Sequence, residues 1–188
     1  MRFSKTSKKV LSVALTAVVA VGALAVPAPK KADAASYKAA LCMQTTNYYC
    51  RDVLSNKNTC KGIKLKTGAK IAGTSATDKT FKKGKFNFTV SLSGFNKAKG
   101  AKAFNFVSVN TTLPGKNKSK LKNVKLVVKV DGKTVKTIKN PAMEPQKGTN
   151  GYVSFLVMNA WNSEAKKKCT SVKMPKKTMS VTVTGQLK

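Results

Sequence analysis

The sequence contains no histidine, and only 6 of its 188 residues are acidic. Without histidine, neither a Ser-His nor a Cys-His nucleophile system can be built. A glycosidase needs two converging carboxylates, and no motif supports such a pair among the acidic residues beyond position 34: Asp52, Asp78, Asp131, Glu144 and Glu164. The oxygen clusters of calcium sites and the glycine-rich nucleotide loops are also missing. The sequence therefore predicts a protein that is not an enzyme and uses no metal or cofactor.

Long hydrophobic runs are scarce as well. The one extended run, Val10–Val26, has 17 residues, fewer than the ~20 that span a bilayer. Basic residues precede it, and the small-residue site Ala32–Ala34 follows it, which is the order of a secretory signal peptide. We therefore expect residues 1–34 to be a signal peptide and residues 35–188 to form one domain. The expected location is extracellular, with retention at the cell wall and no transmembrane segment in the mature chain.

The chain has 37 lysines and arginines but only 6 acidic residues, so its formal net charge is +31. Six basic residues and Asp33 belong to residues 1–34, so the remainder carries +26. Such a field attracts anionic cell-wall polymers, acidic polysaccharides, anionic lipids or nucleic acid. Arg51 is the only arginine after position 34, and base-specific readers favour arginine, so no specific nucleic-acid partner is predicted. The alternative is that the lysines are simply solvated strand faces in a lysine-rich proteome.

Four cysteines follow the leader: Cys42, Cys50, Cys60 and Cys169. An even number in an exported chain predicts two disulfides. Zinc is disfavoured, because the chain has neither a C-x-x-C pair nor histidine. Of the three possible pairings we prefer Cys50–Cys60, which closes a loop, together with Cys42–Cys169, which ties the first strand to the approach of the last.

The mature region has the periodicity of short strands. Residues 84–94 alternate apolar and polar side chains with period two, as do residues 178–186. Residues 121–140 contain two β-rich runs joined by Asp131-Gly132, which favours a type I′ hairpin. Residues 151–161 are apolar on both faces, as in a central strand. About eight such strands predict an all-β fold, a single antiparallel β-sandwich of jelly-roll-like type.

Other segments give more specific expectations. Residues 61–73 should be a strand with Ile63, Leu65 and Ile71 in alternation, and residues 101–110 a strand with Phe104, Phe106 and Ser108 on one face. Loops are expected at 114–120 and 140–151, and a helical turn at 162–168.

Aromatic residues are few, and three of them are candidates for a binding surface: Tyr48, Tyr49 and Trp161. A flat ring combines a large apolar face with a low entropy cost, and polar neighbours then fix the orientation of a ligand. Adjacent residues of a strand point to opposite faces, so at most one of the two tyrosines can enter the core. The alternative is that Trp161 and both tyrosines are packing residues.

Three blocks carry a resemblance: "AALCMQTTNYYCRD", "NVKLVVKVDGKTVK" and "VMNAWN". They resemble accessory β-sandwich domains in secreted proteins of Gram-positive gut and rumen bacteria, which are similar to carbohydrate-binding modules. By this resemblance, Gln44, Arg51, Asn159 and Trp161 match motif positions, and Tyr48 or Tyr49 takes the place of a tryptophan in the first block. The resemblance implies a ligand-binding set of Gln44, Tyr48, Tyr49, Arg51, Asn159 and Trp161.

Together these observations predict a secreted, non-catalytic, cationic module that binds polysaccharide or an anionic cell-wall polymer. The first rival is a structural or adhesion protein of the envelope that is held by charge alone. A second rival, a cationic effector acting on membranes, lacks the amphipathic helix that such proteins use.

Overall fold

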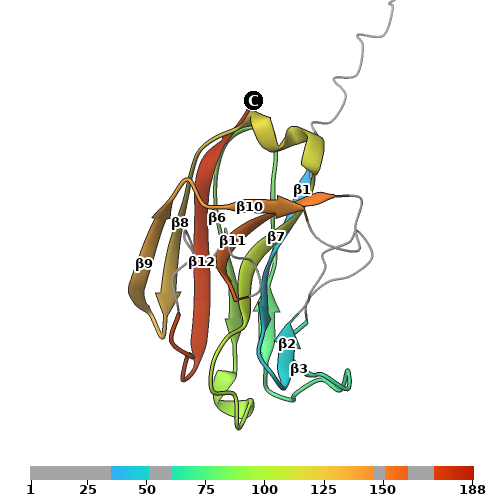
Figure 1. Ribbon diagram of the computed structural model, residues 1–188, viewed down its shortest axis with the longest axis vertical. Helices are drawn as coiled ribbons and strands as arrows, with labels where there is room; N and C mark the ends of the chain where they lie inside the picture. Colours follow the sequence, from blue (N-terminus) through green and yellow to red (C-terminus); the bar gives the residue numbers. More distant parts are fainter. Residues whose placement is uncertain (1–34, 51–60, 146–150, 161–171) are drawn as a thin grey trace, which may run out of the picture. The chain divides into compact units, whose positions relative to one another are not determined.

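The chain folds as two antiparallel β-sheets in a computed structural model, which describes residues 35–50, 61–145, 151–160 and 172–188 (Figure 1). These residues lie within one compact unit, Ala34–Lys188. Apart from twelve strands, the described residues contain two short 3-10 helices, η1 (Phe95–Lys97) and η2 (Gly115–Lys120). The all-β, antiparallel sandwich predicted from the sequence is confirmed.

The larger sheet, called sheet A, has the strand order β10-β11-β7-β1-β2-β3, and β5 pairs with β1 beside β2. Every pair in it is antiparallel. Its strands are β1 (Tyr37–Gln44), β2 (Tyr48–Cys50), β3 (Lys64–Leu65), β5 (Lys79–Phe81), β7 (Phe106–Pro114), β10 (Met143–Pro145) and β11 (Tyr152–Asn159).

The second sheet, sheet B, has the order β4-β6-β12-β8-β9 and is also antiparallel throughout. Its strands are β4 (Ser75–Thr77), β6 (Gly84–Ser93), β12 (Thr178–Leu187), β8 (Leu121–Val130) and β9 (Lys133–Lys139). Only β8 and β9 are consecutive long strands within one sheet. From β6 to β7, from β7 to β8 and from β11 to β12, the chain crosses from one sheet to the other.

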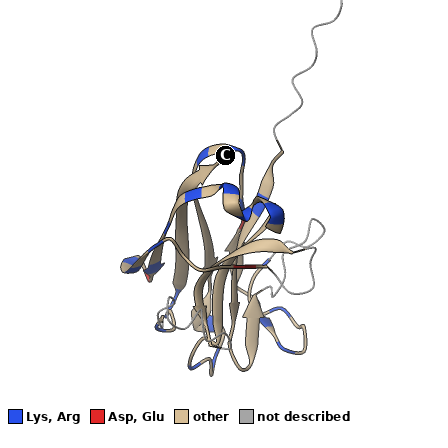
Figure 2. Ribbon diagram, turned by 45° about the horizontal axis from the view of Figure 1, so that its top comes forward, with Lys and Arg blue, Asp and Glu red and all other residues tan. Residues whose placement is uncertain are grey.

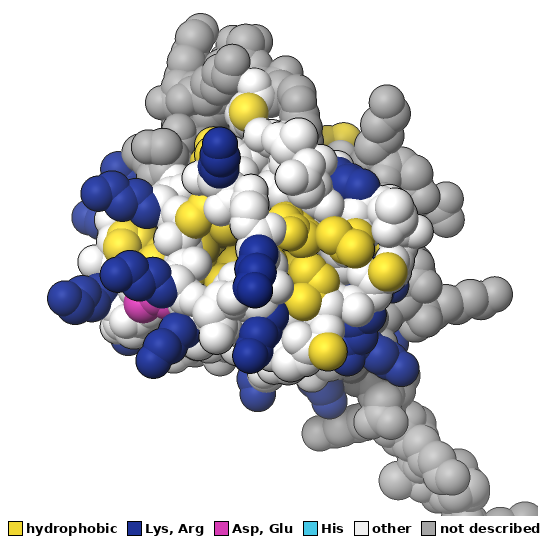
Figure 3. All heavy atoms as spheres, turned by 90° about the horizontal axis from the view of Figure 1, so that it is seen from below, with side chains coloured by type: hydrophobic (Ala, Val, Ile, Leu, Met, Phe, Trp, Pro, Cys, Tyr) yellow, Lys and Arg dark blue, Asp and Glu magenta, His cyan; other side chains and the backbone are white. Residues whose placement is uncertain are grey.

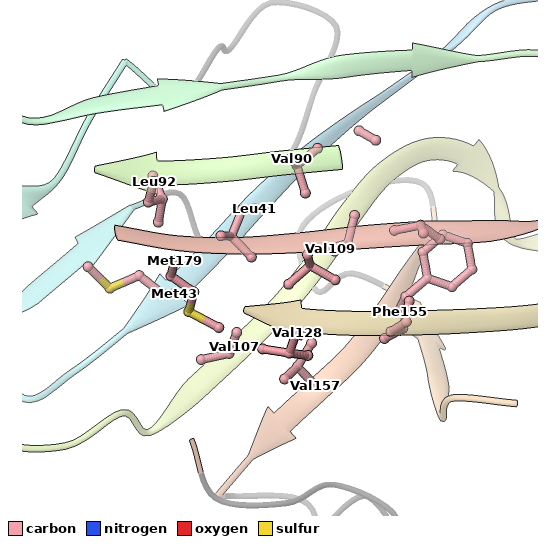
Figure 4. Close-up of a cluster of buried hydrophobic side chains, with 14 of the residues drawn as sticks. Leu41, Met43, Val90, Leu92, Val107, Val109, Val128, Phe155, Val157 and Met179 are labelled. Carbon is pink, nitrogen blue, oxygen red and sulfur yellow. The ribbon is translucent and has the colours of Figure 1, made fainter. Parts of the chain in front are cut away.

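The core lies between the two sheets and follows the alternation of the strands. In β6, Phe86, Phe88, Val90 and Leu92 are buried, whereas the intervening Asn87 and Thr89 are exposed. In β12 the buried set is Met179, Val181, Val183 and Leu187. Figure 4 shows side chains of both sheets meeting in this layer: Leu41, Met43, Val107, Val109, Phe155 and Val157 from sheet A, and Val90, Leu92, Val128 and Met179 from sheet B. Burial of this set is the main stabilising contribution to the fold.

The β8–β9 hairpin turns at Asp131-Gly132, as expected. The φ angles are 47° at Asp131 and 82° at Gly132, and a type I′ turn needs positive φ at both positions. The Asp131 carboxylate has a second role that the sequence did not indicate. It accepts hydrogen bonds from the backbone N–H groups of Lys176, Lys177 and Thr178 at 2.7–2.9 Å, so it fixes the entry into β12.

Two expected strands differ from the structure. Residues 61–73 are mostly turns, with positive φ at Gly68 and Gly73, and only Lys64–Leu65 form a strand. Ile63 is nevertheless buried. In the segment 101–110, the strand begins only at Phe106. Phe104 precedes it and enters the core, whereas Phe106 packs on the opposite face of sheet A with Ala40 and Cys42.

The expected loops also contain structure. Residues 115–120 form η2, and residues 143–145 pair with β11 as β10. The helical turn expected at 162–168 and the signal peptide expected at 1–34 lie outside the described residues.

The preferred disulfide pairing needs correction. Cys42 is a buried thiol, whose Sγ donates to the carbonyl oxygen of Ala40 at 3.8 Å. The expected Cys42–Cys169 bridge is therefore wrong for this structure: Cys42 lies in the middle of β1, opposite Ser108 of β7, and its Sγ bonds to a backbone carbonyl instead. Cys50 belongs to a disulfide, but Cys60 and Cys169 lie outside the described residues, so the Cys50–Cys60 pairing stays a prediction.

Candidate functional site

Three of the residues expected to bind ligand lie in one row across sheet A. The strand registers place Tyr49 of β2 opposite Gln44 of β1, Gln44 opposite Phe106 of β7, and Phe106 opposite Asn159 of β11. Residues directly opposite one another in an antiparallel sheet share a face. Tyr49, Gln44, Phe106 and Asn159 therefore lie on the outer face of sheet A, away from the core, and we call them the cross-strand row.

The two adjacent tyrosines divide between the faces, as their positions in a strand require. Tyr48 is only 8% exposed, belongs to the core, and donates its hydroxyl hydrogen to the carbonyl oxygen of Lys99. Tyr49 points the other way and is half-buried. The structure thus brings Tyr49 into the row and keeps Tyr48 out of it.

Two lysines, Lys64 and Lys66, lie next to the side chain of Tyr49. The Nζ of Lys66 lies 5.7 Å from the centroid of the Tyr49 ring, which is the geometry of a cation–π contact. Lys64 of β3 is opposite Tyr49 in the register and shares its face. At an exposed position such a contact stabilises by about 0.5–1 kcal/mol, so a ligand that stacked on this side of the ring would have to displace Lys66 at a small cost.

Asn159 closes the row at its other end. It is 8% exposed, and its Nδ2 donates to the Glu144 Oε2 at 3.3 Å. Glu144 belongs to β10 and is opposite Ser154 of β11, so it faces the same side. Sequence reasoning missed Glu144 as a neighbour of the site, because the pairing of β10 with β11 depends on tertiary structure.

Beside the row lies a buried polar cluster on the same face. The Asn110 Oδ1 accepts hydrogen bonds from the Ser108 Oγ at 2.6 Å and the Ser154 Oγ at 2.5 Å. All three residues are at most 3% exposed. The only sequence signal for this cluster was the alternation of polar with apolar residues along β7. Because each group is satisfied, the cluster holds β7 and β11 in register rather than offering unpaired donors.

The strand ends around the row are fixed by backbone hydrogen bonds. The N–H of Asn105 donates to the carbonyl of Gln44, and the N–H of Ala160 donates to the carbonyl of Asn105, each at 2.8 Å. Next to them is a hollow of about 260 Å³. It is lined by two loops, residues 45–47 and residues 100–105. A small hollow therefore lies next to the backbone of Gln44 and Asn105 at this end of the sheet.

Two residues of the expected set, Arg51 and Trp161, lie outside the described residues. Among the residues that are described, no three His, Cys, Asp or Glu side chains group as metal ligands. In that same part of the chain, no helix has the length and apolar character needed to cross a membrane. The site therefore offers one half-buried phenol ring, a second aromatic side chain and amide groups, with Lys64 and Lys66 beside the phenol ring.

Lysines are distributed widely over the described surface. Figure 2 shows them on η2, on the β8–β9 hairpin and on the loops at the opposite end, with few acidic residues among them. Seen from below in Figure 3, they surround an area of hydrophobic side chains. The local field at the cross-strand row is therefore positive, as it is elsewhere on the protein.

No family model, curated protein or solved structure matches this chain.

Proposed function

We propose that this protein is a secreted, non-catalytic module that binds carbohydrate through the outer face of sheet A, and that its charge retains it on anionic polymers of the cell wall. The observation that carries the proposal is the cross-strand row. It places a half-buried tyrosine, an amide and a second aromatic on three neighbouring strands of one sheet face. The alternation of long strands between sheets supports the jelly-roll-like description, an architecture found among lectin domains.

The row has the elements that sugar recognition needs. An aromatic ring offers an apolar surface to the C–H face of a pyranose, while amides fix the direction of its hydroxyls. Tyr49 and Phe106 supply the rings, and Gln44 lies between them. Since neighbouring strands are about 4.8 Å apart, the row from Tyr49 to Asn159 spans three strand spacings, or roughly 14 Å, which suits an oligosaccharide better than a single sugar.

The alternative remains a structural or adhesion protein that charge alone holds in the envelope. It would need no specific residue on sheet A, and every contact would weaken together as salt rises. The two functions therefore predict different salt dependences, and this difference defines the experiment.

The test is a pull-down of the purified protein on insoluble neutral glycans, acidic glycans and cell walls, at low salt and at ~0.5 M salt, where screening shortens to a few ångströms. We expect binding to at least one glycan to survive the higher salt and to fall at least about tenfold in Tyr49→Ala. Tyr48→Phe is the matched control, because it keeps a ring in the core and leaves the row intact. Loss of binding on every matrix at high salt would leave the charge-only alternative.

A further inference from the structure

The outer face of sheet B carries lysines in an ordered arrangement. Gln186 of β12 lies between Lys85 of β6 and Lys122 of β8 in the strand registers. In the next row, Lys125 of β8 is directly opposite Lys139 of β9. Because opposed residues share a face, these four exposed lysines gather at one end of a single sheet face. We call this set the lysine face: Lys85, Lys122, Lys125 and Lys139.

The clustering of lysines on the lysine face destabilises sheet B. Like charges directly opposite one another, such as Lys125 and Lys139, destabilise a strand pair. The five strands of sheet B contain seven lysines and no acidic residue, so nothing within these strands neutralises them. Edge protection explains lysines on β9, which is an edge strand. It does not explain Lys85 and Lys122, which flank the central strand β12.

Beyond these lysines the face carries mainly hydroxyl groups, together with Asn87, Val127 and Lys129. Thr89 and Thr182 share a hydrogen bond of 2.8 Å between their Oγ1 atoms, and Ser75 and Ser93 share one of 2.7 Å between their Oγ atoms. No aromatic side chain occupies an outward position of these strands, since their only aromatics, Phe86 and Phe88, are buried. The face can thus offer ammonium and hydroxyl donors, but no surface on which a base could stack.

We propose that the lysine face is a docking surface for a linear polymer of polyol phosphates. This deepens the proposed function, because it assigns retention on anionic wall polymers to one face instead of to the net charge. Lysine ammonium groups bind phosphate as point charges, and the five strands contain no arginine, so these ammonium groups are the only cationic donors of the strands. Without aromatics, the face gives no advantage to nucleic acid over a polymer that lacks bases.

The dimensions suit an extended chain lying across the strands. Strands in a sheet are about 4.8 Å apart, so the backbones of Lys85 and Lys122, on either side of β12, are roughly 10 Å apart. Lys125 and Lys139 extend the positive surface by one strand toward the edge at β9. A flexible phosphate polymer crossing β6, β12, β8 and β9 can therefore meet several ammonium groups in succession.

The test compares two quadruple variants of equal net charge. The face variant carries Lys85→Gln, Lys122→Gln, Lys125→Gln and Lys139→Gln. The control carries Lys70→Gln, Lys97→Gln, Lys99→Gln and Lys133→Gln, which change four exposed lysines that lie off this face. Affinity for poly(glycerol phosphate) is measured at several salt concentrations, and thermal unfolding checks that both variants fold.

We expect the face variant to lose at least about tenfold in affinity near ~0.1 M salt and to show a shallower salt dependence, since fewer counterions are released. The control should lose less than about threefold. Equal losses in the two variants would overturn the proposal, because the net charge alone would then set the affinity. Tighter binding of poly-dT or of polygalacturonate through the same four lysines would also overturn it, in favour of a nucleic acid or a uronate polymer.

The outcome is separable from the proposed glycan site. The face variant should keep the salt-resistant glycan binding, and Tyr49→Ala should keep the binding of poly(glycerol phosphate). If no glycan binds but the face variant alone loses the phosphate polymer, the glycan site fails and the docking surface stands. If glycan binding depends on Tyr49 but both quadruple variants lose the phosphate polymer equally, the docking surface fails and the glycan site stands.

Discussion

Tyr48 and Tyr49 are neighbours in the sequence, yet they serve different parts of the molecule. The side chain of Tyr48 is enclosed in the core and bonded to the carbonyl of Lys99, whereas Tyr49 faces outward under Lys66. A substitution at one position should therefore affect stability, and a substitution at the other should affect binding.

Tyr48→Phe removes the hydroxyl hydrogen bond and leaves the Lys99 carbonyl without this donor. We expect the free energy of unfolding to fall by about 1 kcal/mol, the usual net value of one intramolecular hydrogen bond. Tyr49→Phe changes a half-buried residue and should stay within about 0.5 kcal/mol. Urea unfolding followed by fluorescence would measure both. A larger loss in Tyr49→Phe than in Tyr48→Phe would contradict the assignment of the two faces.

Asp131 makes stability depend on pH at the acid end. Three backbone N–H groups, led by that of Thr178, hold the pKa of the Asp131 carboxyl below its usual value of 3.8. A lowered pKa in the folded state means that the stabilisation is fully present above the unfolded value and is lost as pH falls through the folded value. In Asp131→Asn, the melting temperature should therefore be lower than that of the wild type at neutral pH.

The difference between the two proteins should shrink as pH drops below 3.8, because the wild-type carboxylate is then protonated. Thermal unfolding recorded from neutral to strongly acidic pH provides the measurement. A gap of constant size across this range would show that the charge of Asp131 has no part in fixing β12.

Among the elements, β12 is the most constrained strand. It is the centre of sheet B, pairing with β6 on one side and with β8 on the other, and it has a register shift between Thr184 and Gln186. Gly185 lies at this shift. A Cβ placed there would be 2.7 Å from the Cζ of Phe86 and 3.2 Å from a methyl group of Val124. The lack of a side chain at Gly185 thus leaves room for the Phe86 ring to pass close to the backbone of β12.

Gly185→Val should destabilise the protein by about 1–3 kcal/mol, because the added side chain overpacks the space against Phe86. Ser180→Ala, at an outward position of the same strand, is the control and should cost less than about 0.5 kcal/mol. Chemical denaturation of both variants tests this, and a neutral Gly185→Val would mean that the Phe86 ring moves aside freely.

The pairing of β8 with β9 offers a test of the lysine face that does not involve a ligand. Lys139→Glu converts the opposed Lys125–Lys139 pair into one of opposite charge, which should stabilise by about 0.2–1 kcal/mol at low salt. High salt should reduce this gain. The same substitution should weaken binding of poly(glycerol phosphate). A variant that became more stable and also bound the polymer more tightly would contradict the role of Lys139.

At the scale of the whole molecule, repulsion among the many lysines is an unfavourable electrostatic contribution to the stability of the folded state. With a formal net charge of +31 on the chain, the compact state gains from any screening of its own lysines. Raising the salt concentration from ~0.01 M to ~0.5 M should therefore increase the free energy of unfolding by about 1 kcal/mol, or ~2–4 °C in melting temperature for a domain of this size. Differential scanning calorimetry would show the trend, and an unchanged melting temperature would indicate that the lysines lie too far apart to interact.

Periodicity predicted the parts of the fold that depend on local pattern. The inward sets of β6, β8 and β12 and the turn at Asp131-Gly132 follow from alternation and turn chemistry, which short stretches of sequence contain. Residues 61–73 also alternate, yet their glycines turn the chain with positive φ, and this local geometry overrides the pattern.

The candidate site could be predicted only in part. Gln44, Tyr49 and Asn159 were chosen from motifs, but their common face depends on registers between β2, β1, β7 and β11, which are distant in the sequence. Phe106 and Glu144 were missed for this reason. The bridge expected at Cys42 was also wrong, because the sequence could not show that this side chain lies on the outer face of sheet A with Ala40 and Phe106 and bonds to the backbone.

The central position of β12 has a consequence for the order in which the protein can assemble. β6 and β8 do not pair with each other, and both pair with β12, which follows every other strand in the chain. During synthesis on a ribosome, or during passage through a membrane pore, sheet B therefore cannot form until residues 178–187 have emerged. Thr89 and Thr182, which bond to each other, are 93 positions apart. Contacts of such long sequence separation slow folding. We therefore expect sheet B to stay unfolded, and the chain able to pass through a narrow pore, until β12 is available for pairing.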